Sequence, residues 1–425
     1  MKTFVVPGDW RSWVPVAPES HFPIQNLPYG IFSTRDGRPA RVGVAIGEFI
    51  LDTGLLHDAG LLDGPDVFSA DTLNPLMSLG RGAWTALRQR LAELLRDSEP
   101  VLRDDERLRA RVLVPMADAT LHMPVHIGAF VDFYSSEQHA SNVGRMFRDP
   151  ERPLLPNWKH LPVGYNGRAS SVVGSGTDVI RPCGQTVTSN EGPPSFGPSR
   201  QLDFELEVGF FTGADNPLGD TVAEDQVDDF VFGLVLVNDW SARDVQRWEY
   251  APLGPFLAKS FATSISPWVV PVDALLPFRV PGPEQDPTPL PHLQTALPWH
   301  FDVQLEVAIQ TDRATKPQRV CRTNFRHMYW SLAQQLLHQA SNGTNVQVGD
   351  LYASGTISGP DPDSYGSMLE LAWRGERPIA IEETGETRVF IHDGDRVLMS
   401  GWAQGAGFRV GFGELCNRVA PARVR

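Results

Sequence analysis

The spacing of hydrophobic and polar residues divides the chain into two parts with different predicted elements. Short apolar runs at residues 42–46 and 49–51, on either side of a glycine, are typical of small β-strands. Over residues 82–97 the apolar residues recur at helical intervals, which predicts an amphipathic helix with a charged outer face. A charged stretch then leads into sequence of a different character. We therefore predict a small first domain, residues 1–118, and a large second domain, residues 119–425.

The larger part is predicted to consist mainly of short strands between Gly and Pro turns. Residues 230–237 form a nearly continuous apolar run, which is typical of a buried strand. Two segments rich in Pro and Gly, 181–200 and 277–298, are predicted to be long surface excursions. One long helix is expected before a stop signal at residues 341–343, and its apolar stripe comprises Phe325, Met328, Tyr329, Leu332, Ala333 and Leu336.

Composition and charge limit the classes of partner that we expect for the chain. Its 425 residues include 37 basic and 51 acidic ones, and the net charge of −14 disfavours the phosphate attraction of nucleic-acid binders. That charge is explained by a solvated surface or by acidic clusters that hold cations. The longest apolar run is too short to cross a bilayer, and the N-terminus lacks the apolar stretch of a signal peptide. With three widely spaced cysteines, we expect a cytoplasmic protein without nucleic-acid or membrane partners.

The sharpest chemical pattern is the strict alternation of acidic and apolar residues over residues 202–208. If this segment is a strand, Glu205 and Glu207 point the same way, with side chains that start roughly 7 Å apart. They are then either the solvated face of an edge strand or two ligands of one cation. The apolar run at 230–237 leads to Asp239, where a buried carboxylate needs a partner or a metal ion. Carboxylates without His or Cys favour a hard ion such as Mg²⁺ or Ca²⁺.

A third element carries the histidine of greatest interest. Ser135 and Gln138 have the spacing of a capping box, which predicts that a helix begins there. One face of this helix would carry, at helical intervals, His139, Val143 and Phe147. His139 is then either a packed core histidine or a general base at the start of a helix that opens toward Asp132 and Tyr134.

Five segments carry a resemblance that extends over almost the whole chain. They read FPIQNLPYGIFST, LPNWKHLPVGYNGRASS, NDWSARDVQRWEYAPLGPFLAKSFATSISPW, SGTISGPDPDSYGSMLE and GFRVGFGEL, in this order. The chain resembles the fumarylacetoacetase family, also called the fumarylacetoacetate hydrolase family. The resemblance implies a mainly β protein of the α+β class, in which a small SH3-like N-terminal barrel precedes a large β-rich catalytic domain with a β-roll. It also implies assembly as a homodimer.

The resemblance further implies a role for each candidate site residue. The positions that match a site for Mg²⁺, Ca²⁺ or both are Asp132, Glu205, Glu207, Asp239, Lys259 and Thr263. Because a protonated lysine has no lone pair to offer a metal ion, Lys259 would act beside the ion as a charge or through its carbonyl. His139 matches the general base and Glu370 the acid that orients it, while Arg243, Gln246 and Lys259 would face a developing oxyanion. The positions that match substrate contacts are Tyr134, Arg148, Tyr165, Gln246, Tyr250 and Thr356.

The implied reaction is hydrolysis of the carbon–carbon bond of 4-fumarylacetoacetate, a β-diketo acid, to fumarate and acetoacetate. This is the last step of tyrosine and phenylalanine catabolism. Water deprotonated by His139 would attack the carbonyl group next to the fumaryl unit, while the cation acts as a Lewis acid on the diketone. The residue types of the motifs fit this chemistry, because a dicarboxylate bound by an acidic protein needs local cations.

Two departures from the family pattern lie near these positions. Residues 129–131 are Ala-Phe-Val where Asp-Tyr-Thr is expected, and Glu137 replaces an expected arginine. The nearest rival function is a sister reaction, such as acylpyruvate hydrolysis or decarboxylation of a keto acid, and the long N-terminal domain argues against it. A rival of another class is a non-catalytic cation-binding scaffold, which the presence of His139 and Glu370 disfavours.

Overall fold

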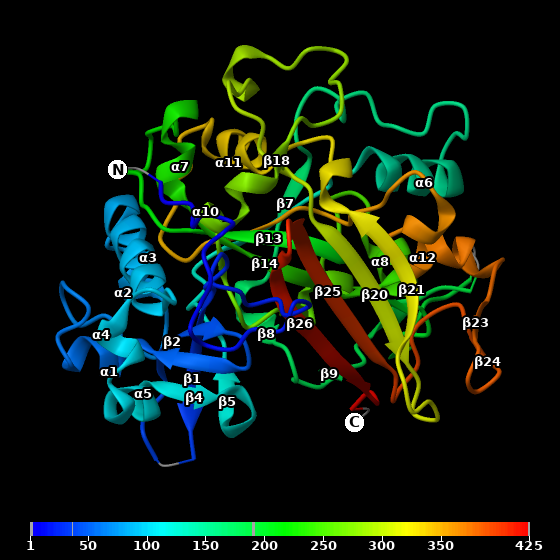
Figure 1. The fold of residues 1–425 in the computed structure, drawn as a ribbon. Helices are drawn as coiled ribbons and strands as arrows, with labels where there is room; N and C mark the ends of the chain where they lie inside the picture. Colours follow the sequence, from blue (N-terminus) through cyan, green and yellow to red (C-terminus); the bar gives the residue numbers. More distant parts are fainter. Residues whose placement is uncertain (1–2, 36, 189–191, 424–425) are drawn as a thin grey trace.

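The computed structural model describes residues 3–35, 37–188 and 192–423 (Figure 1). The N-terminal part is built on a five-stranded antiparallel sheet with the strand order β4-β3-β2-β1-β5. The sharp turn after β2 lies at Gly47, whose φ of 56° is readily adopted by glycine. The strands are β1 (Tyr29–Thr34), β2 (Arg41–Ile46), β3 (Phe49–Asp52), β4 (Leu113–Pro115) and β5 (Ala119–His122).

Helices accompany this sheet. The predicted amphipathic helix is α3, and its apolar face buries Trp84, Leu91, Leu94 and Leu95. The helices of this part are α1 (Thr53–Asp58), α2 (Asn74–Met77), α3 (Arg81–Leu95), α4 (Pro100–Arg103) and α5 (Glu106–Val112). The predicted domain boundary at residue 118 falls immediately before β5, which pairs with β1.

An eight-stranded sheet forms the centre of the larger part. Most of its strands follow the order β7-β6-β22-β13-β14-β16-β8, and a further strand pairs with β14. The strands are β6 (Phe130–Phe133), β7 (Gly164–Asn166), β8 (Val172–Gly174), β13 (Leu206–Thr212), β14 (Val231–Asp239), β16 (Thr263–Ile265), β17 (Val270–Pro271) and β22 (Leu351–Ala353).

A second sheet has the order β21-β20-β25-β26-β9, and its long strands stand at the front of Figure 1. Its strands are β9 (Val179–Ile180), β20 (Gln304–Gln310), β21 (Gln318–Asn324), β25 (Arg396–Gly405) and β26 (Phe408–Ala420). Short two-stranded pairs are β10 (Cys183–Thr186) with β11 (Ser195–Pro198), β12 (Leu202–Asp203) with β15 (Ser241–Ala242), β18 (Arg279–Val280) with β19 (His300–Phe301), and β23 (Ile379–Ile381) with β24 (Glu386–Arg388).

Strand β14 explains why the sequence contains such a long apolar run. Leu234 and Leu236 lie in the core of the larger part, whereas Phe232 and Val235 lie in a core shared with the N-terminal part. Phe232 packs edge to face against Trp84 of α3, with ring centroids 5.0 Å apart. Both faces of the strand are therefore covered, and polar residues have no place until the strand ends.

The larger part contains seven α-helices among the described residues, two of which, α6 and α11, begin later than the sequence pattern predicted. They are α6 (Glu137–Phe147), α7 (Val227–Phe230), α8 (Arg243–Glu249), α9 (Leu257–Ser260), α10 (Val272–Leu275), α11 (Leu332–Ala340) and α12 (Met368–Leu371). The cap of α6 is Ser136, because the Ser135 hydroxyl instead accepts a hydrogen bond from Gln335. The predicted helix through Phe325 was wrong over residues 325–331, because Ser331 caps α11 and Phe325 starts a separate short 3-10 turn.

The predicted fold class is confirmed: a mainly β protein of the α+β class with a small SH3-like N-terminal domain and a large β-rich domain. The segment 181–200 is only partly an excursion, since β10 and β11 form a hairpin within it, and residues 189–191 lie outside the described residues. In the segment 277–298, most residues are exposed but Leu293 is fully buried. Among the described residues, no helix is long and apolar enough to cross a membrane.

Candidate active site

Three strands of the central sheet bring three carboxylates together. Asp132 lies on β6, Glu207 on β13 and Asp239 at the end of β14. Each contributes an oxygen atom to a group in which the atoms lie within 4.8 Å of one another, and all three side chains are buried. We call these three residues the carboxylate cluster. The solvated edge-strand interpretation of Glu205 and Glu207 is thereby ruled out, because the two side chains are 5% and 0% exposed.

The carboxylate cluster lacks hydrogen-bond donors for part of its negative charge. Among the residues that the structure describes, the buried oxygens Oδ1 of Asp132 and Oε1 of Glu207 have no hydrogen-bond partner. Burial, followed by the charge of Asp239, raises the pKa of Asp132 well above its usual value, and burial with the charge of Asp132 does the same for the pKa of Glu207. Unpartnered carboxylate oxygens without His or Cys form a donor set suited to a hard divalent cation.

Glu205 has a different environment, although it lies two residues from Glu207. Its Oε1 accepts a hydrogen bond from Arg243 Nη2 at 2.6 Å, and its Oε2 is paired with Lys259 Nζ. Burial would raise the pKa of Glu205, but the charges of Lys259 and Arg243 outweigh burial and lower it. In this geometry both oxygens are occupied by cationic side chains. The role of Glu205 as a direct metal ligand stays a prediction.

Asp239 is shared between the carboxylate cluster and these cationic side chains. Its Oδ2 accepts hydrogen bonds from Lys259 Nζ at 2.6 Å and from Tyr165 Oη at 3.0 Å, while Thr263 Oγ1 donates to Oδ1 at 2.8 Å. Burial lowers the pKa of Lys259, but Asp239 and Glu205 more than compensate and raise it. Lys259 is therefore a charged neighbour of the cluster, as expected for a side chain that stabilises negative charge beside a cation.

His139 and Glu370 form a buried hydrogen-bonded pair. His139 Nδ1 lies 2.7 Å from Glu370 Oε2, and the two side chains are 3% and 0% exposed. The predicted stripe of His139, Val143 and Phe147 does not form a core face, because Phe147 is 47% exposed. Since Nδ1 is engaged by the carboxylate, Nε2 is the ring nitrogen left to take a proton from water.

Glu370 receives further donors that sequence reasoning did not identify. Asn142 Nδ2 donates to Oε1 at 2.9 Å, Ser358 Oγ lies 3.0 Å from both oxygens, and Ser367 Oγ donates to Oε2 at 2.8 Å. Burial would raise the pKa of Glu370, but His139 and these hydrogen bonds lower it. Ser367 could have been found from its Ser-x-x-Glu spacing, and Asn142 from its position one helical turn after His139. Ser358 has no local sequence signal.

The predicted substrate-contacting residues are distributed around this centre. Tyr134 packs edge to face on His139, with ring centroids 5.2 Å apart, and Gln246 Oε1 accepts a hydrogen bond from Arg243 at 3.2 Å. Thr356 is buried and follows Gly355, whose N–H donates to Glu207 at 3.0 Å. Arg148 donates to the Pro153 carbonyl and lies near enough to Tyr134 for its charge to act on that side chain, whereas Tyr250 is 57% exposed.

The two departures from the family pattern do not alter the carboxylate cluster directly. Ala129 is exposed, and its N–H donates to Asp350 Oδ1 at 3.1 Å. Burial raises the pKa of Asp350 to about 6. Glu137 forms an ion pair with Lys159 Nζ at 2.8 Å in the first turn of α6, where a negative charge is favoured by the helix dipole.

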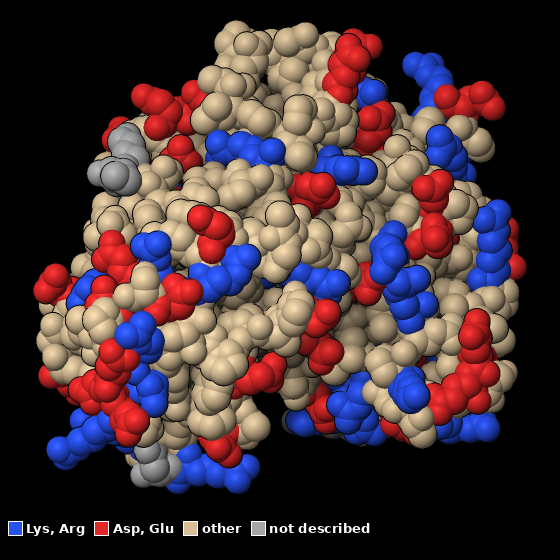
Figure 2. Space-filling model, viewed as in Figure 1, with Lys and Arg blue, Asp and Glu red and all other residues tan. Residues whose placement is uncertain are grey.

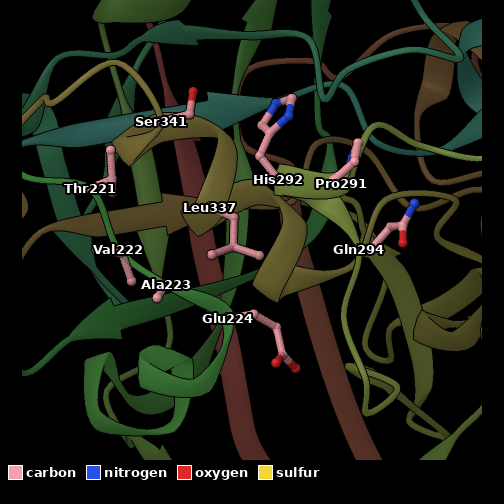
Figure 3. Close-up of a pocket in the computed structure, with 9 residues that line it drawn as sticks. All are labelled: Thr221, Val222, Ala223, Glu224, Pro291, His292, Gln294, Leu337 and Ser341. Atoms are coloured by element: carbon pink, nitrogen blue, oxygen red, sulfur yellow. The ribbon is translucent and has the colours of Figure 1, made fainter.

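The outer surface and its cavity are separate from the predicted site residues. Lys and Arg side chains are interspersed with Asp and Glu over the face seen in Figure 2, as expected for a solvated surface. A surface cavity of about 450 Å³ lies elsewhere, and none of the predicted site residues lines it (Figure 3). It is lined by Thr221, Val222, Ala223, Glu224, Pro291, His292, Gln294, Leu337 and Ser341.

A buried His–Glu pair and a carboxylate cluster suited to a cation, both carried on one β-rich domain, are groups that a cation-assisted hydrolase requires. Comparisons with known proteins agree and are more specific. Residues 25–124 match the family described as "Fumarylacetoacetase N-terminal", and residues 128–420 match "Fumarylacetoacetate (FAA) hydrolase C-terminal". The chain belongs to the fumarylacetoacetase family.

The similarity extends over nearly all of the chain. It is 54% identical over 417 residues to fumarylacetoacetase of Rattus norvegicus, covering 97% of this chain and 99% of that protein. It is 52% identical to fumarylacetoacetase of Homo sapiens with the same coverage. A fumarylacetoacetate hydrolase from Exiguobacterium antarcticum shares the fold, with a TM-score of 0.52, 17% identity, and coverage of 93% of this chain and 100% of that chain.

Proposed function

We propose that this chain hydrolyses 4-fumarylacetoacetate to fumarate and acetoacetate, the last step of tyrosine and phenylalanine catabolism. The proposal rests on two buried groups of one domain, the His139–Glu370 pair and the carboxylate cluster, in a chain 54% identical to a fumarylacetoacetase over nearly its full length. His139 is close enough to Glu205 for its charge to lower the pKa of that acid. The substrate is a dicarboxylate with a β-diketone. Cationic side chains of this chain are suited to bind the negatively charged oxygens of such a substrate. The clustered acids are suited to hold the cation that would act on the diketone.

We propose that Asp132, Glu207 and Asp239 hold Mg²⁺ or Ca²⁺. Glu205 would join them as a fourth ligand only if Arg243 and Lys259 released it. The unpartnered buried oxygens of Asp132 and Glu207 support this assignment. When bound, such an ion would supply Lewis acidity to a ketone substrate. The choice of ion rests on the hard oxygen donors, which do not favour zinc or copper.

The chain's own residues account for the remaining steps. Glu370 holds His139 at Nδ1, so that Nε2 accepts a proton from the attacking water. Arg243, Gln246 and Lys259 lie together and are proposed to donate hydrogen bonds to the oxyanion of the tetrahedral intermediate. The proposed substrate contacts are Tyr134, Arg148, Tyr165, Gln246, Tyr250 and Thr356. Burial of the centre strengthens these interactions, because little water remains to screen them.

The test is spectrophotometric loss of fumarylacetoacetate by protein stripped with a chelator and then given Mg²⁺ or Ca²⁺. We expect activity that returns with the cation and yields fumarate and acetoacetate in equal amounts. Folded protein that leaves fumarylacetoacetate intact with either ion, but cleaves an acylpyruvate or decarboxylates a keto acid, would assign the sister reaction instead. Cation binding without turnover of any of these substrates would indicate a non-catalytic scaffold.

We further propose a homodimer, supported by an exposed apolar patch. The patch is defined by Phe196, Trp248, Tyr250, Leu253, Phe256 and Leu257, which are 40% to 96% exposed. Trp248 Nε1 donates to Gln185 on β10, whose partner on β11 is Phe196, so the hairpin and the segment after α8 are contiguous. Exposed apolar groups in such a cluster are typical of a protein–protein interface.

Light scattering tests this assembly. We expect a dimer that Leu253→Asp and Phe256→Asp convert to monomer, while the matched change Leu218→Asp, at a site 79% exposed outside the patch, leaves it intact. A monomeric wild-type protein would contradict the proposal.

We also propose a cytoplasmic location, which the unpaired thiols of Cys183, Cys321 and Cys416 support. We propose in addition that the boundary between the two domains lies near residue 118.

A further inference from the structure

Asp203 is a buried carboxylate to which none of the roles above is assigned. It is fully buried on β12, where it pairs with Ser241 of β15. It accepts hydrogen bonds from two parts of the chain that are far apart in sequence. Arg243 Nε donates to Oδ2 at 2.7 Å, Met368 N donates to Oδ1 at 2.7 Å, and Leu369 N donates to Oδ2 at 3.2 Å.

The first of these parts is the Arg243 side chain. Asp203 holds the guanidinium at Nε, which leaves Nη2 to donate to Glu205 at 2.6 Å and Nη1 to donate to Gln246 at 3.2 Å. A guanidinium is planar, so fixing Nε also fixes the directions of its other donors. The position of the proposed oxyanion donor therefore depends on Asp203.

The second part is the short helix α12. Met368 and Leu369 are its first two residues, and the next residue is Glu370, which holds His139 at Nδ1. Ser367, which caps α12, also donates to Glu370 at 2.8 Å. A shift of the two N–H groups held by Asp203 would move the carboxylate that orients the proposed base.

We propose that Asp203 is a positioning residue that holds Arg243 and Glu370 in register with each other. One carboxylate then sets the relative placement of the oxyanion donor and of the His139 base, although they reach the site from β15 with α8 and from α12. This inference rests on the proposed function for its catalytic consequence. An asparagine at this position would lose the ion pair with Arg243. Its amide N–H₂ group would also face one of the N–H groups that now donate to Asp203, and two donors cannot form a hydrogen bond with each other.

The first experiment is steady-state kinetics of Asp203→Asn with fumarylacetoacetate and Mg²⁺. We expect kcat to fall roughly 10- to 100-fold, as for other residues that orient catalytic groups, with little change in KM or in Mg²⁺ affinity. Asp203→Glu is measured beside it, because it keeps the charge that balances buried Arg243 while displacing both partners by one methylene. It should fold and still lower kcat.

The matched control is Asp395→Asn. Asp395 is 1% exposed, accepts hydrogen bonds from Arg388 Nε at 2.7 Å and Nη2 at 2.9 Å, and accepts one from the N–H of His392 at 2.9 Å. It is therefore a comparable buried aspartate outside the candidate active site. If the Asp203 variants lose no more kcat per folded molecule than Asp395→Asn does, the positioning role is overturned.

A double-mutant cycle and NMR separate positioning from general stability. In an Arg243→Gln background, Asp203→Asn should lower kcat by a clearly smaller factor than it does in the wild type. An equal loss of kcat in both backgrounds would overturn the proposed coupling between Asp203 and Arg243. The His139 ring N–H proton resonance should shift in Asp203→Asn and stay in place in Asp395→Asn. That resonance requires no turnover, so an unmoved signal overturns the inference even if the wild type is inactive on fumarylacetoacetate. An inactive wild type with a shifted signal would instead overturn only the proposed function.

Discussion

The acids of the carboxylate cluster and Glu370 are all buried, yet their surroundings are built in opposite ways. Asp132 and Glu207 each have a buried oxygen without a partner, and burial raises their pKa values. Glu370 accepts hydrogen bonds from four side chains, and its pKa is lowered. Burial alone therefore does not assign a role to an acid. Asp132 and Glu207, each with an oxygen short of donors, are suited to a cation, whereas Glu370 is saturated with donors, fixed in place and able to orient a base. Asp239 lies between these cases, because it belongs to the cluster although both of its oxygens accept hydrogen bonds.

The largest expected effect is that of removing the proposed general base, His139, and it tests whether the base and the carboxylate cluster act independently. His139→Ala should lower kcat by about 10²- to 10⁴-fold, because proton removal from water then has no positioned acceptor. The change leaves the carboxylate cluster intact, so calorimetric titration with Mg²⁺ should give an unchanged affinity. Retained turnover would remove His139 from the mechanism, and a parallel loss of Mg²⁺ binding would show that the two regions are not separate.

The next effect distinguishes two acids within one strand pattern. Glu207→Gln removes a member of the carboxylate cluster and should weaken Mg²⁺ binding by at least about tenfold, with a loss of activity at limiting Mg²⁺. Glu205→Gln should weaken Mg²⁺ binding less, because Glu205 is held by Arg243 and Lys259, and should lower kcat instead. Titration calorimetry of both variants decides between them. Equal losses of Mg²⁺ affinity would make Glu205 a direct ligand.

The sequence predicts where the strands with the acidic residues lie, but it does not predict which hydrogen-bond partners each acid has. The alternation over 202–208 correctly predicted that Leu202, Phe204, Leu206 and Val208 share one core, but the segment is divided into β12 and β13 with Glu205 between them. The apolar run correctly placed Asp239 at the end of a buried strand. Partners that come from distant segments have no local signal. Ser358 reaches Glu370, and Met368 reaches Asp203 across 165 residues, only because the fold brings these segments together.

Helix starts were less predictable for a related reason. Ser135 and Ser136 are both suitable caps by composition, and only the tertiary contact of Ser135 with Gln335 leaves the role to Ser136. The stripe through Phe325 has helical spacing, yet Asn324 and Ser331 each cap a separate turn and divide it. Local pattern establishes that an element exists more securely than where it begins.

A pH titration sharpens the comparison in the absence of any mutation. The raised pKa values of Asp132 and Glu207 mean that these carboxyls retain protons that a cation must displace, so Mg²⁺ affinity should fall by up to about tenfold per pH unit and per proton as pH decreases. In the cation-free protein the stability that these groups contribute is present below their unfolded pKa values and is lost as pH rises through the raised ones. Mg²⁺ should therefore raise Tm more at about pH 8 than at about pH 6.

Calorimetry in two buffers of different ionisation enthalpy measures the protons released by Mg²⁺. Release should decrease in the wild type as pH rises through the raised pKa values of Asp132 and Glu207, and it should be smaller in Glu207→Gln. Binding without proton release at any pH in this range would contradict the raised pKa values and place the cation elsewhere.

The smallest expected effect concerns the region saturated with donors. Ser358→Ala removes one hydrogen bond from Glu370, while Asn142, Ser367 and His139 continue to hold it. A net loss of about 0.5–1.5 kcal/mol in positioning corresponds to roughly 2- to 13-fold in kcat, and Mg²⁺ affinity should not change. Combining Ser358→Ala with Asn142→Ala removes a second donor, so the combined loss should exceed the product of the single losses if the donors substitute for one another. Strictly multiplicative losses would mean that each donor acts alone, and that saturation of Glu370 provides no reserve.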